Sequence, residues 1–148
     1  MPIRNSFAVE DKNLSVSTIL GTRNVQYKDI DLSFKNKTSG EIFKKQDAAA
    51  VKQAVKNLLL TNYGEKPFNP DFGGDLRSLL FELADNDLEE EIEERVIAAV
   101  NRYEPRVGAL RVEAIVNPDR NTVYVTATFK IINTQEEVIL SIPLARLR

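Results

Sequence analysis

The sequence of 148 residues predicts an α+β fold, a two-layer single domain in which an antiparallel meander sheet packs against about three helices. A change in the spacing of apolar residues carries this prediction. Apolar side chains recur at helical spacing between residues 48 and 103, and they alternate with a period of two after residue 109. The length is that of one domain, because a chain of about 150 residues buries enough surface for one core.

Residues 1–24 are expected to form an N-terminal extension or arm, because their short apolar pairs show no sustained period. The domain itself is expected to span residues 25–148. It begins with alternating apolar and polar residues from Val25 to Phe34, followed by turn-forming residues at 37–40 and a second short apolar pair. This pattern predicts a small hairpin.

A first helix is expected from Ala48 to Asn62. Its apolar positions repeat at helical spacing, at Val51, Val55, Leu58 and Leu59. Asp47 is of the residue type that caps helix N-termini, and Gly64 is of the type that ends helices.

The segment from Tyr63 to Asp75 contains three glycines, two prolines and three aromatic residues. Glycine and proline disfavour regular structure while aromatic side chains favour burial, so we expect an ordered loop pinned by Phe68 and Phe72. Loops this long are uncommon in compact domains and are often functional, although this one could simply cover an end of the core.

Two more helices are expected, from Leu76 to Ala84 with Asp75 as its cap, and from Asn86 or Asp87 to Tyr103. The second has one apolar stripe, formed by Leu88, Ile92, Val96, Ala99, Val100 and Tyr103. Five glutamates occupy its first turns, where negative charge favours the positive end of the helix dipole. We interpret this acidic run as a solvated helix face, the alternative being a patch for a basic partner.

Three strands are expected to complete the domain. Leu110 to Val116 and Val123 to Ile131 alternate apolar and polar residues, with a turn at 117–121 between them, and the turn region from Asn133 to Glu137 leads to a third strand, Val138 to Leu144. Such strands form an antiparallel meander whose apolar face packs on the helices.

Histidine, cysteine and tryptophan are absent. The chain therefore has no disulfide framework, thiolate nucleophile, imidazole metal site or Ser-His-Asp triad, and we expect neither a metal nor a cofactor. With 20 basic and 22 acidic side chains it lacks the basic footprint of a nucleic-acid or membrane binder. No apolar run approaches the ~20 residues of a membrane span, and no secretory signal is visible, so we expect a cytoplasmic protein.

The junction after the last helix reads Glu104-Pro105-Arg106. Proline stiffens the junction, and residues two apart in an extended backbone project to the same side, so Glu104 and Arg106 could project as an acid-base pair. Such a pair suits recognition, because arginine makes bidentate bonds to carboxylates and glutamate accepts from arginine or backbone N–H groups. The alternative is an ion pair closed within the domain.

Four short motifs together resemble one family. They are Tyr27 to Phe34, Lys66 to Leu76, Leu80 to Glu82 and Asn101 to Val107. Their order and spacing resemble the baseplate wedge family of contractile-tailed bacteriophages, which includes the small baseplate component of type VI secretion systems. The resemblance extends from about Tyr27 to about Ile132.

The resemblance implies a structural protein of a virion tail baseplate, assembled in the host cytoplasm. In this family the Glu-Pro-Arg motif, here Glu104, Pro105 and Arg106, docks on a helical core bundle of the larger wedge subunits. The domain also resembles the part of tail sheath subunits that links neighbours by shared strands, which implies strand sharing with the first sheath ring. Phe68 and Phe72 are expected to lie partly at an interface. The sequence leaves open which sheet edge is shared.

Murein hydrolysis by a tail lysozyme is the alternative function, because some members of the family carry that description. A carboxylate pair is the simple mechanism that the composition leaves open. The candidates are Glu65, Asp71, Asp75, Glu82 and Glu104, with Glu104 and Glu82 foremost. Since 22 carboxylates give close pairs by chance and no tryptophan is present to stack on sugars, we expect no enzymatic activity.

Overall fold

The computed structural model describes residues 27–35, 40–81 and 86–145, so the expected arm at 1–24 lies outside the described residues. The α+β class is confirmed. The elements, in chain order, are β1 (Lys28–Ile30), β2 (Lys44–Gln46), α3 (Asp47–Leu60), α4 (Leu76–Leu79), α5 (Asn86–Tyr103), β3 (Val107–Asn117), η2 (Pro118–Arg120), β4 (Thr122–Ile131) and β5 (Glu137–Ala145).

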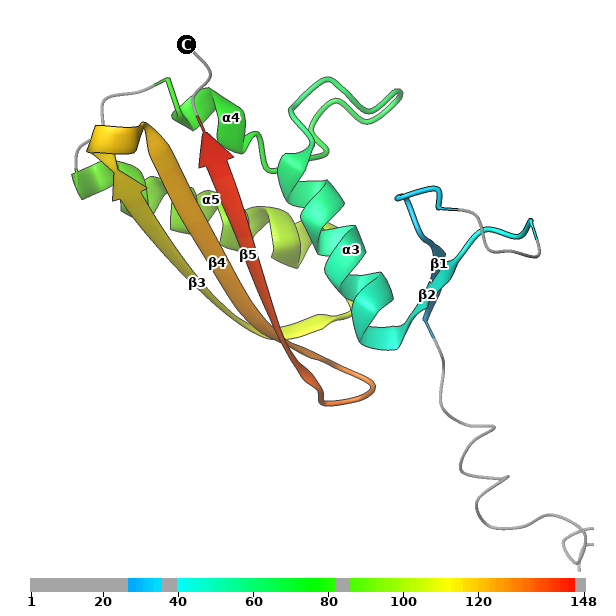
Figure 1. Cartoon of the computed structure of the whole chain (residues 1–148). Helices are drawn as coiled ribbons and strands as arrows, with labels where there is room; N and C mark the ends of the chain where they lie inside the picture. The colour runs from blue at the N-terminus through cyan, green and yellow to red at the C-terminus, as the bar shows by residue number, and fades with distance from the viewer. Residues whose placement is uncertain (1–26, 36–39, 82–85, 146–148) are drawn as a thin grey trace, which may run out of the picture.

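The three long strands form an antiparallel sheet in the order β3-β4-β5, as predicted. Helices α3 and α5 cover one face of it, with α3 beside β5 and the β1–β2 hairpin on the far side of α3 (Figure 1). The side chains of β5 alternate between exposed and buried along its whole length, as the period of two predicts. Within the described residues, no helix combines the length and apolar character of a membrane span.

The core lies between the helices and the sheet. The predicted stripe of α5 supplies Leu88, Ile92, Val96, Ala99 and Val100, all buried, whereas Tyr103 at its end is half-buried. Phe129 and Ile131 of β4 are the largest sheet side chains that are fully buried. Periodicity was a reliable guide here because apolar burial dominates the stability of both layers.

The predicted cap at Asp47 is wrong, whereas Asp75 occupies the predicted N-cap position of α4 without a side-chain cap bond. Asp47 is the first residue of α3, and its Oδ1 accepts a hydrogen bond from the N–H of Tyr27 at 3.2 Å instead of capping the helix. Asp75 is left-handed, with φ of 45°, and its side chain makes no cap bond to α4. In both cases long-range or loop geometry determined the role of a side chain whose type suits a cap.

Two helices end earlier than predicted. Helix α3 ends at Leu60, before Asn62, because the backbone becomes extended at Thr61, where ψ is 129°. Helix α4 ends at Leu79, and residues 82–84 of the predicted helix lie outside the described residues. The predicted start and end of α5 are correct.

Candidate functional site

Glu104, Pro105 and Arg106 form the corner between α5 and β3. The Glu104 N–H donates to the Val100 carbonyl at 2.9 Å, so the helical pattern reaches the start of the corner. The Arg106 carbonyl accepts from the Ile132 N–H at 3.0 Å, which ties the end of the corner to the residue after β4. The exposed Pro105 lies between these two fixed points, so the backbone of the corner is rigid on both sides.

Glu104 and Arg106 bind each other in the isolated chain. Arg106 Nε lies 2.5 Å from Glu104 Oε1, and its Nη2 lies 2.6 Å from Oε2, which makes a bidentate pair. Glu104 is only 7% exposed, whereas the Arg106 side chain is 31% exposed. The hydrogen bonds that Arg106 donates to the Glu104 carboxylate raise the pKa of Arg106 above its ordinary value. The ion pair within the domain, one of the two alternatives above, is therefore present.

The Arg106 guanidinium also lies 5.3 Å from the centre of the Tyr27 ring, at the start of the described N-terminal segment. An arginine over an aromatic face is held by the ring quadrupole as well as by its carboxylate. Tyr27 belongs to one of the four sequence motifs, but no sequence pattern indicates its contact with Arg106, because the two residues are far apart in the chain.

The loop between α3 and α4 is fixed where it meets the corner. The centres of the Phe72 and Tyr103 rings lie 5.0 Å apart, and the Tyr103 hydroxyl donates to the Asp71 backbone carbonyl at 2.8 Å. Gly73 has φ of 132°, and a Cβ there would lie 2.3 Å from the Thr61 carbonyl oxygen. Only glycine permits this close approach to the end of α3, so the loop is ordered by backbone contact as well as by Phe72.

Phe68 does not pin the loop, and that part of the prediction is wrong. Its side chain is fully exposed. Its backbone φ is 64°, and a positive φ is rare for a bulky residue. The Asn69 N–H donates to the Lys66 carbonyl at 3.3 Å and closes a turn with Phe68 at its tip. The structure thus brings Phe72 to the corner through Tyr103 and leaves Phe68 facing solvent.

The edge of the sheet at β3 is closed by α5. The carboxylate of Glu93 accepts the N–H of Ala114 at 2.9 Å, and that of Glu89 accepts the N–H of Val116 at 2.8 Å. Our interpretation of the whole acidic run as a solvated face is therefore wrong for these two half-buried glutamates. Their spacing of four residues, which puts both on one helix side, was the available signal.

Among the described residues, no strand pairs with the outer side of β5, so this edge is open. The N–H of Ala114 points away from β4, so Ala114 and its register partner Val125 form a pair without mutual hydrogen bonds. The main-chain groups of Val125 therefore point toward β5, where they meet those of Ile142. Main-chain groups alternate in direction along a strand, so those of Ser141 and Pro143 point outward. Pro143 therefore costs the sheet no internal hydrogen bond, and its placement is that of an edge-strand proline.

Three of the five carboxylates proposed for hydrolysis are otherwise engaged or lie outside the described residues. Both Glu104 oxygens bind Arg106. Glu65 accepts from the Asn62 N–H at 3.0 Å, and this bond lowers its pKa below 4.5. Glu82 lies outside the described residues. Among the described residues, no group of three or more carboxylates could hold a metal ion.

Comparison with known proteins places this fold in a family. A family model described as "Baseplate wedge protein gp25" matches residues 45–136. Baseplate wedge protein gp25 of Enterobacteria phage T4 is 30% identical over 115 residues, which cover 78% of this chain and 87% of the phage protein.

Solved structures share the fold. A candidate tail lysozyme of Geobacter sulfurreducens has a TM-score of 0.59 at 22% identity, covering 66% of this chain and 89% of that one. A chain of the anti-feeding prophage baseplate has a TM-score of 0.54 at 16% identity, covering 82% and 88%. A chain of the type VI secretion baseplate complex has a TM-score of 0.56 at 13% identity, covering 66% and 93%.

At these identities the solved structures establish the shared architecture, while the family model and the phage T4 relative establish descent. The resemblance stated from the four sequence motifs is confirmed by both. The chain therefore belongs to the baseplate wedge protein gp25 family and is a structural component of a contractile-tail baseplate.

Proposed function

We propose that this chain joins the larger wedge subunits of the baseplate to the first ring of the tail sheath. The corner at Glu104, Pro105 and Arg106 binds the helical core bundle of the wedge, and the β5 edge accepts a strand from a sheath subunit. The arrangement of the sheet supports two simultaneous partners, because the corner starts β3 and the open edge is β5, on opposite sides of β4.

The corner can bind a partner without breaking its own ion pair. A guanidinium carries five N–H donors, and Glu104 uses one on Nε and one on Nη2. The other three remain for carbonyls or carboxylates of a wedge subunit. Glu104 then acts as a buried holder of the guanidinium, and Arg106, which is part-exposed, makes the contact.

The aromatic loop extends the same surface. Phe72 is held beside the corner by Tyr103, and Lys66 Nζ lies 3.7 Å from the centre of the Phe72 ring. Phe68 protrudes from the loop with its whole side chain in water. A large aromatic group held in a strained conformation and left in water suits insertion into an apolar pocket of a partner.

The open edge of β5 is the single observation that carries the sheath-binding half of the proposal. An incoming strand gains main-chain hydrogen bonds from Ser141 and its outward neighbours, as in strand addition generally. The β3 edge offers no equivalent site at Ala114 and Val116, where Glu89 and Glu93 already accept the N–H groups. This difference supports strand sharing at β5 rather than at β3.

Replacing Ser141 by proline tests this half. The substitution removes one outward N–H at the middle of β5 and leaves the ladder to β4 intact, so we expect a normal fold and at least a tenfold loss of binding to the purified sheath subunit. The control is Ser141→Ala, which keeps the N–H. Equal sheath binding by both variants, measured by biolayer interferometry, would contradict strand sharing at β5.

Replacing Arg106 by lysine tests the other half. Alanine would leave the buried Glu104 carboxylate without its partner, whereas lysine keeps the charge and loses the planar fork. We expect a weakening of assembly with the larger wedge subunits by about 2 kcal/mol, as for a buried arginine anchor. Unchanged wedge assembly in a co-purification titration would argue against docking through the corner.

Murein hydrolysis is not proposed for this chain. A general acid needs a carboxyl group that can hold and release a proton toward the substrate, and both oxygens of Glu104 are bonded to Arg106. Release of peptidoglycan fragments by the purified chain, lost in Glu104→Gln but retained in Glu113→Gln, would overturn this conclusion.

A further inference from the structure

A groove of about 570 Å³ runs along the open edge of the sheet. Leu140 and Ser141 of β5 form one wall, and Asp31 to Ser33 of the N-terminal segment form the opposite wall. The floor is one side of α3, including Lys52 and Lys56. A strand added to β5 would lie in this groove, because Ser141 is both a lining residue and an outward-pointing member of the edge.

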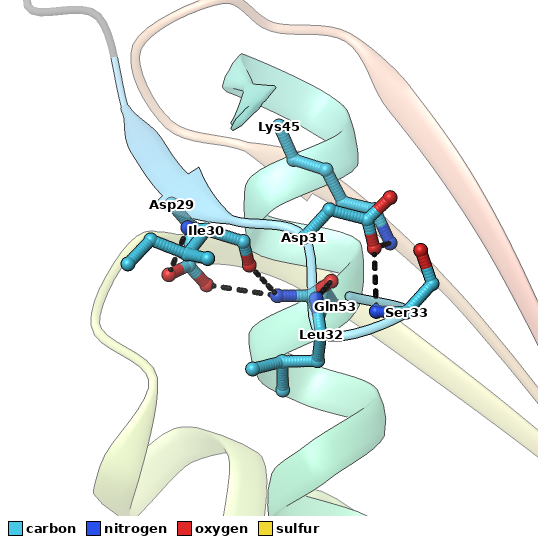
Figure 2. Close-up of polar contacts among 7 residues, drawn as sticks. All are labelled: Asp29, Ile30, Asp31, Leu32, Ser33, Lys45 and Gln53. Carbon is cyan, nitrogen blue, oxygen red and sulfur yellow. Dashed lines mark hydrogen bonds and ion pairs between the residues drawn. The ribbon is translucent and has the colours of Figure 1, made fainter. Parts of the chain in front are cut away.

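The wall opposite β5 is held in place by a buried glutamine of α3. Gln53 is 7% exposed, and its Nε2 donates to the Ile30 carbonyl at 2.8 Å and to Asp29 Oδ2 at 3.2 Å. Figure 2 shows this side chain directed from α3 into the turn that follows β1. Because an amide held from two sides fixes the segment above it, the groove has two walls of defined position.

The floor carries an uncompensated positive charge. Lys45 pairs with Asp31 at 3.3 Å, but in the described part of the chain no ion pair or hydrogen bond engages Lys52 or Lys56. These two lysines lie one helical turn apart on the side of α3 that faces the groove. Two exposed cations beside an open strand edge attract a segment of opposite charge.

We infer that the strand added to β5 is acidic on its helix-facing side, with two carboxylates at positions i and i+2 that pair with Lys52 and Lys56. This inference rests on the proposed strand sharing and adds the chemistry of the shared strand. The spacing supports it, since four residues of helix rise about 6 Å and two residues of strand rise about 6.6 Å. Helix α3 runs beside β5 in the same general direction (Figure 1). The spacing of the two lysines along α3 can therefore match the spacing of the two carboxylates along a strand added to β5.

The test uses the full chain, the purified sheath subunit and an array of ten-residue peptides that tile the sheath sequence. We expect the wild-type chain to capture peptides with acidic residues at alternate positions. The double variant Lys52→Glu/Lys56→Glu should bind the intact sheath subunit at least tenfold more weakly and should lose those peptides. The fold is expected to survive, because the change exchanges one like-charged, exposed pair at i and i+4 for another.

The matched control is Arg77→Glu/Arg120→Glu, which makes the same change in net charge at exposed positions outside the groove. It should bind like the wild type. Binding of Lys52→Glu/Lys56→Glu within twofold of this control, or capture of peptides without an acidic bias, would overturn the inference. If Ser141→Pro still blocked binding in that case, strand sharing would stand without the charge pairing. If the wild-type chain bound no sheath subunit, the proposed function itself would fail.

Discussion

The two edge strands of the sheet, β3 and β5, have similar burial patterns, but side chains of α5 close the β3 edge while the β5 edge borders a groove. Both β3 and β5 alternate apolar residues that face the helices with residues exposed to solvent. At β3, two glutamates of α5 accept the outward N–H groups of Ala114 and Val116. At β5, the outward main-chain groups of Ser141 face a groove.

The difference shows how one small sheet can bind a partner strand without aggregating. An unpaired edge is a template for any extended chain, and proteins limit this risk by covering edges or placing proline and charge on them. Here one edge is covered from within the domain. The other is left open but bordered by Pro143 and by a lysine-lined groove, which restricts the strands that fit.

The largest expected effect comes from opening the closed edge. The double variant Glu89→Ala/Glu93→Ala removes two charge-assisted hydrogen bonds, each worth about 1.5 to 3 kcal/mol, so we expect a loss of about 3 kcal/mol in the free energy of unfolding. The freed edge should also give dimers or larger species in size-exclusion chromatography. The control is Glu90→Ala/Glu94→Ala, at exposed positions of the same helix. If the two double variants had the same urea midpoint, the hydrogen bonds that close the β3 edge would contribute nothing to stability.

A second effect is expected at the corner from which β3 begins. Glu104→Gln removes the charge that pairs with Arg106, and we expect the free energy of unfolding to fall by about 2 kcal/mol because the lost bonds are buried on the glutamate side. The control is Glu113→Gln, whose ion pair with Arg111 is exposed and should contribute at most about 0.5 kcal/mol. If chemical denaturation gave equal losses of unfolding free energy for Glu104→Gln and Glu113→Gln, burial of Glu104 would not strengthen its ion pair.

A smaller effect is expected beside the open edge. Gln53→Met keeps the volume of the side chain but removes its hydrogen bonds to Asp29 and Ile30 of β1 and to the Leu32 N–H after it, so we expect a loss of about 1 kcal/mol. Amide hydrogen exchange should speed up at Asp31, whose N–H bonds to Phe43, and stay slow in β4. The control is Asn57→Met at an exposed groove position. Unchanged exchange at Asp31 would mean that Gln53 does not hold this wall.

The smallest effect concerns pH at the same wall. The Ser33 N–H, at 3.0 Å from Asp31 Oδ1, and then Lys45 hold the pKa of Asp31 below its ordinary value of 3.8. A lowered folded-state pKa means that this carboxylate stabilises the wall above pH 3.8 and loses that contribution as pH falls through the lowered value. An NMR titration should show the low pKa, and Lys45→Met should raise it only in part. A pKa at or above 3.8 would contradict the Ser33 contact.

The elements that periodicity predicted are those whose stability comes from one buried face. Helix α5 and the three strands match the prediction because burial of Ile92 or Phe129 depends on a repeating pattern along a continuous segment. Polar side chains were less predictable. Asp47 suits a helix cap, yet it binds Tyr27, which is 20 residues earlier in the chain. A polar group can satisfy its hydrogen bonds with any partner that the fold brings near.

The candidate site shows the same division. The Glu104-Pro105-Arg106 corner was identifiable from its motif and its place between a helix and a strand, and the structure adds that the two charges bind each other. Phe72 was correctly expected to hold the loop, while Phe68 was not, because composition does not tell which of two aromatic residues lies at a turn tip. Tyr27, Glu89 and Glu93 had no assigned contact, since each acts across a long sequence separation.

The sequence by itself determined the α+β class, the meander, the family and the absence of histidine and cysteine chemistry, since these depend on composition, periodicity and local motifs. Only the tertiary structure decided which sheet edge is closed, which loop aromatic is buried and which lysines border a groove. The physical reason is that each of those outcomes depends on contacts between segments distant in the chain. Glu93 closes the edge at Ala114 only because packing of α5 on the sheet brings its carboxylate within 2.9 Å of that N–H.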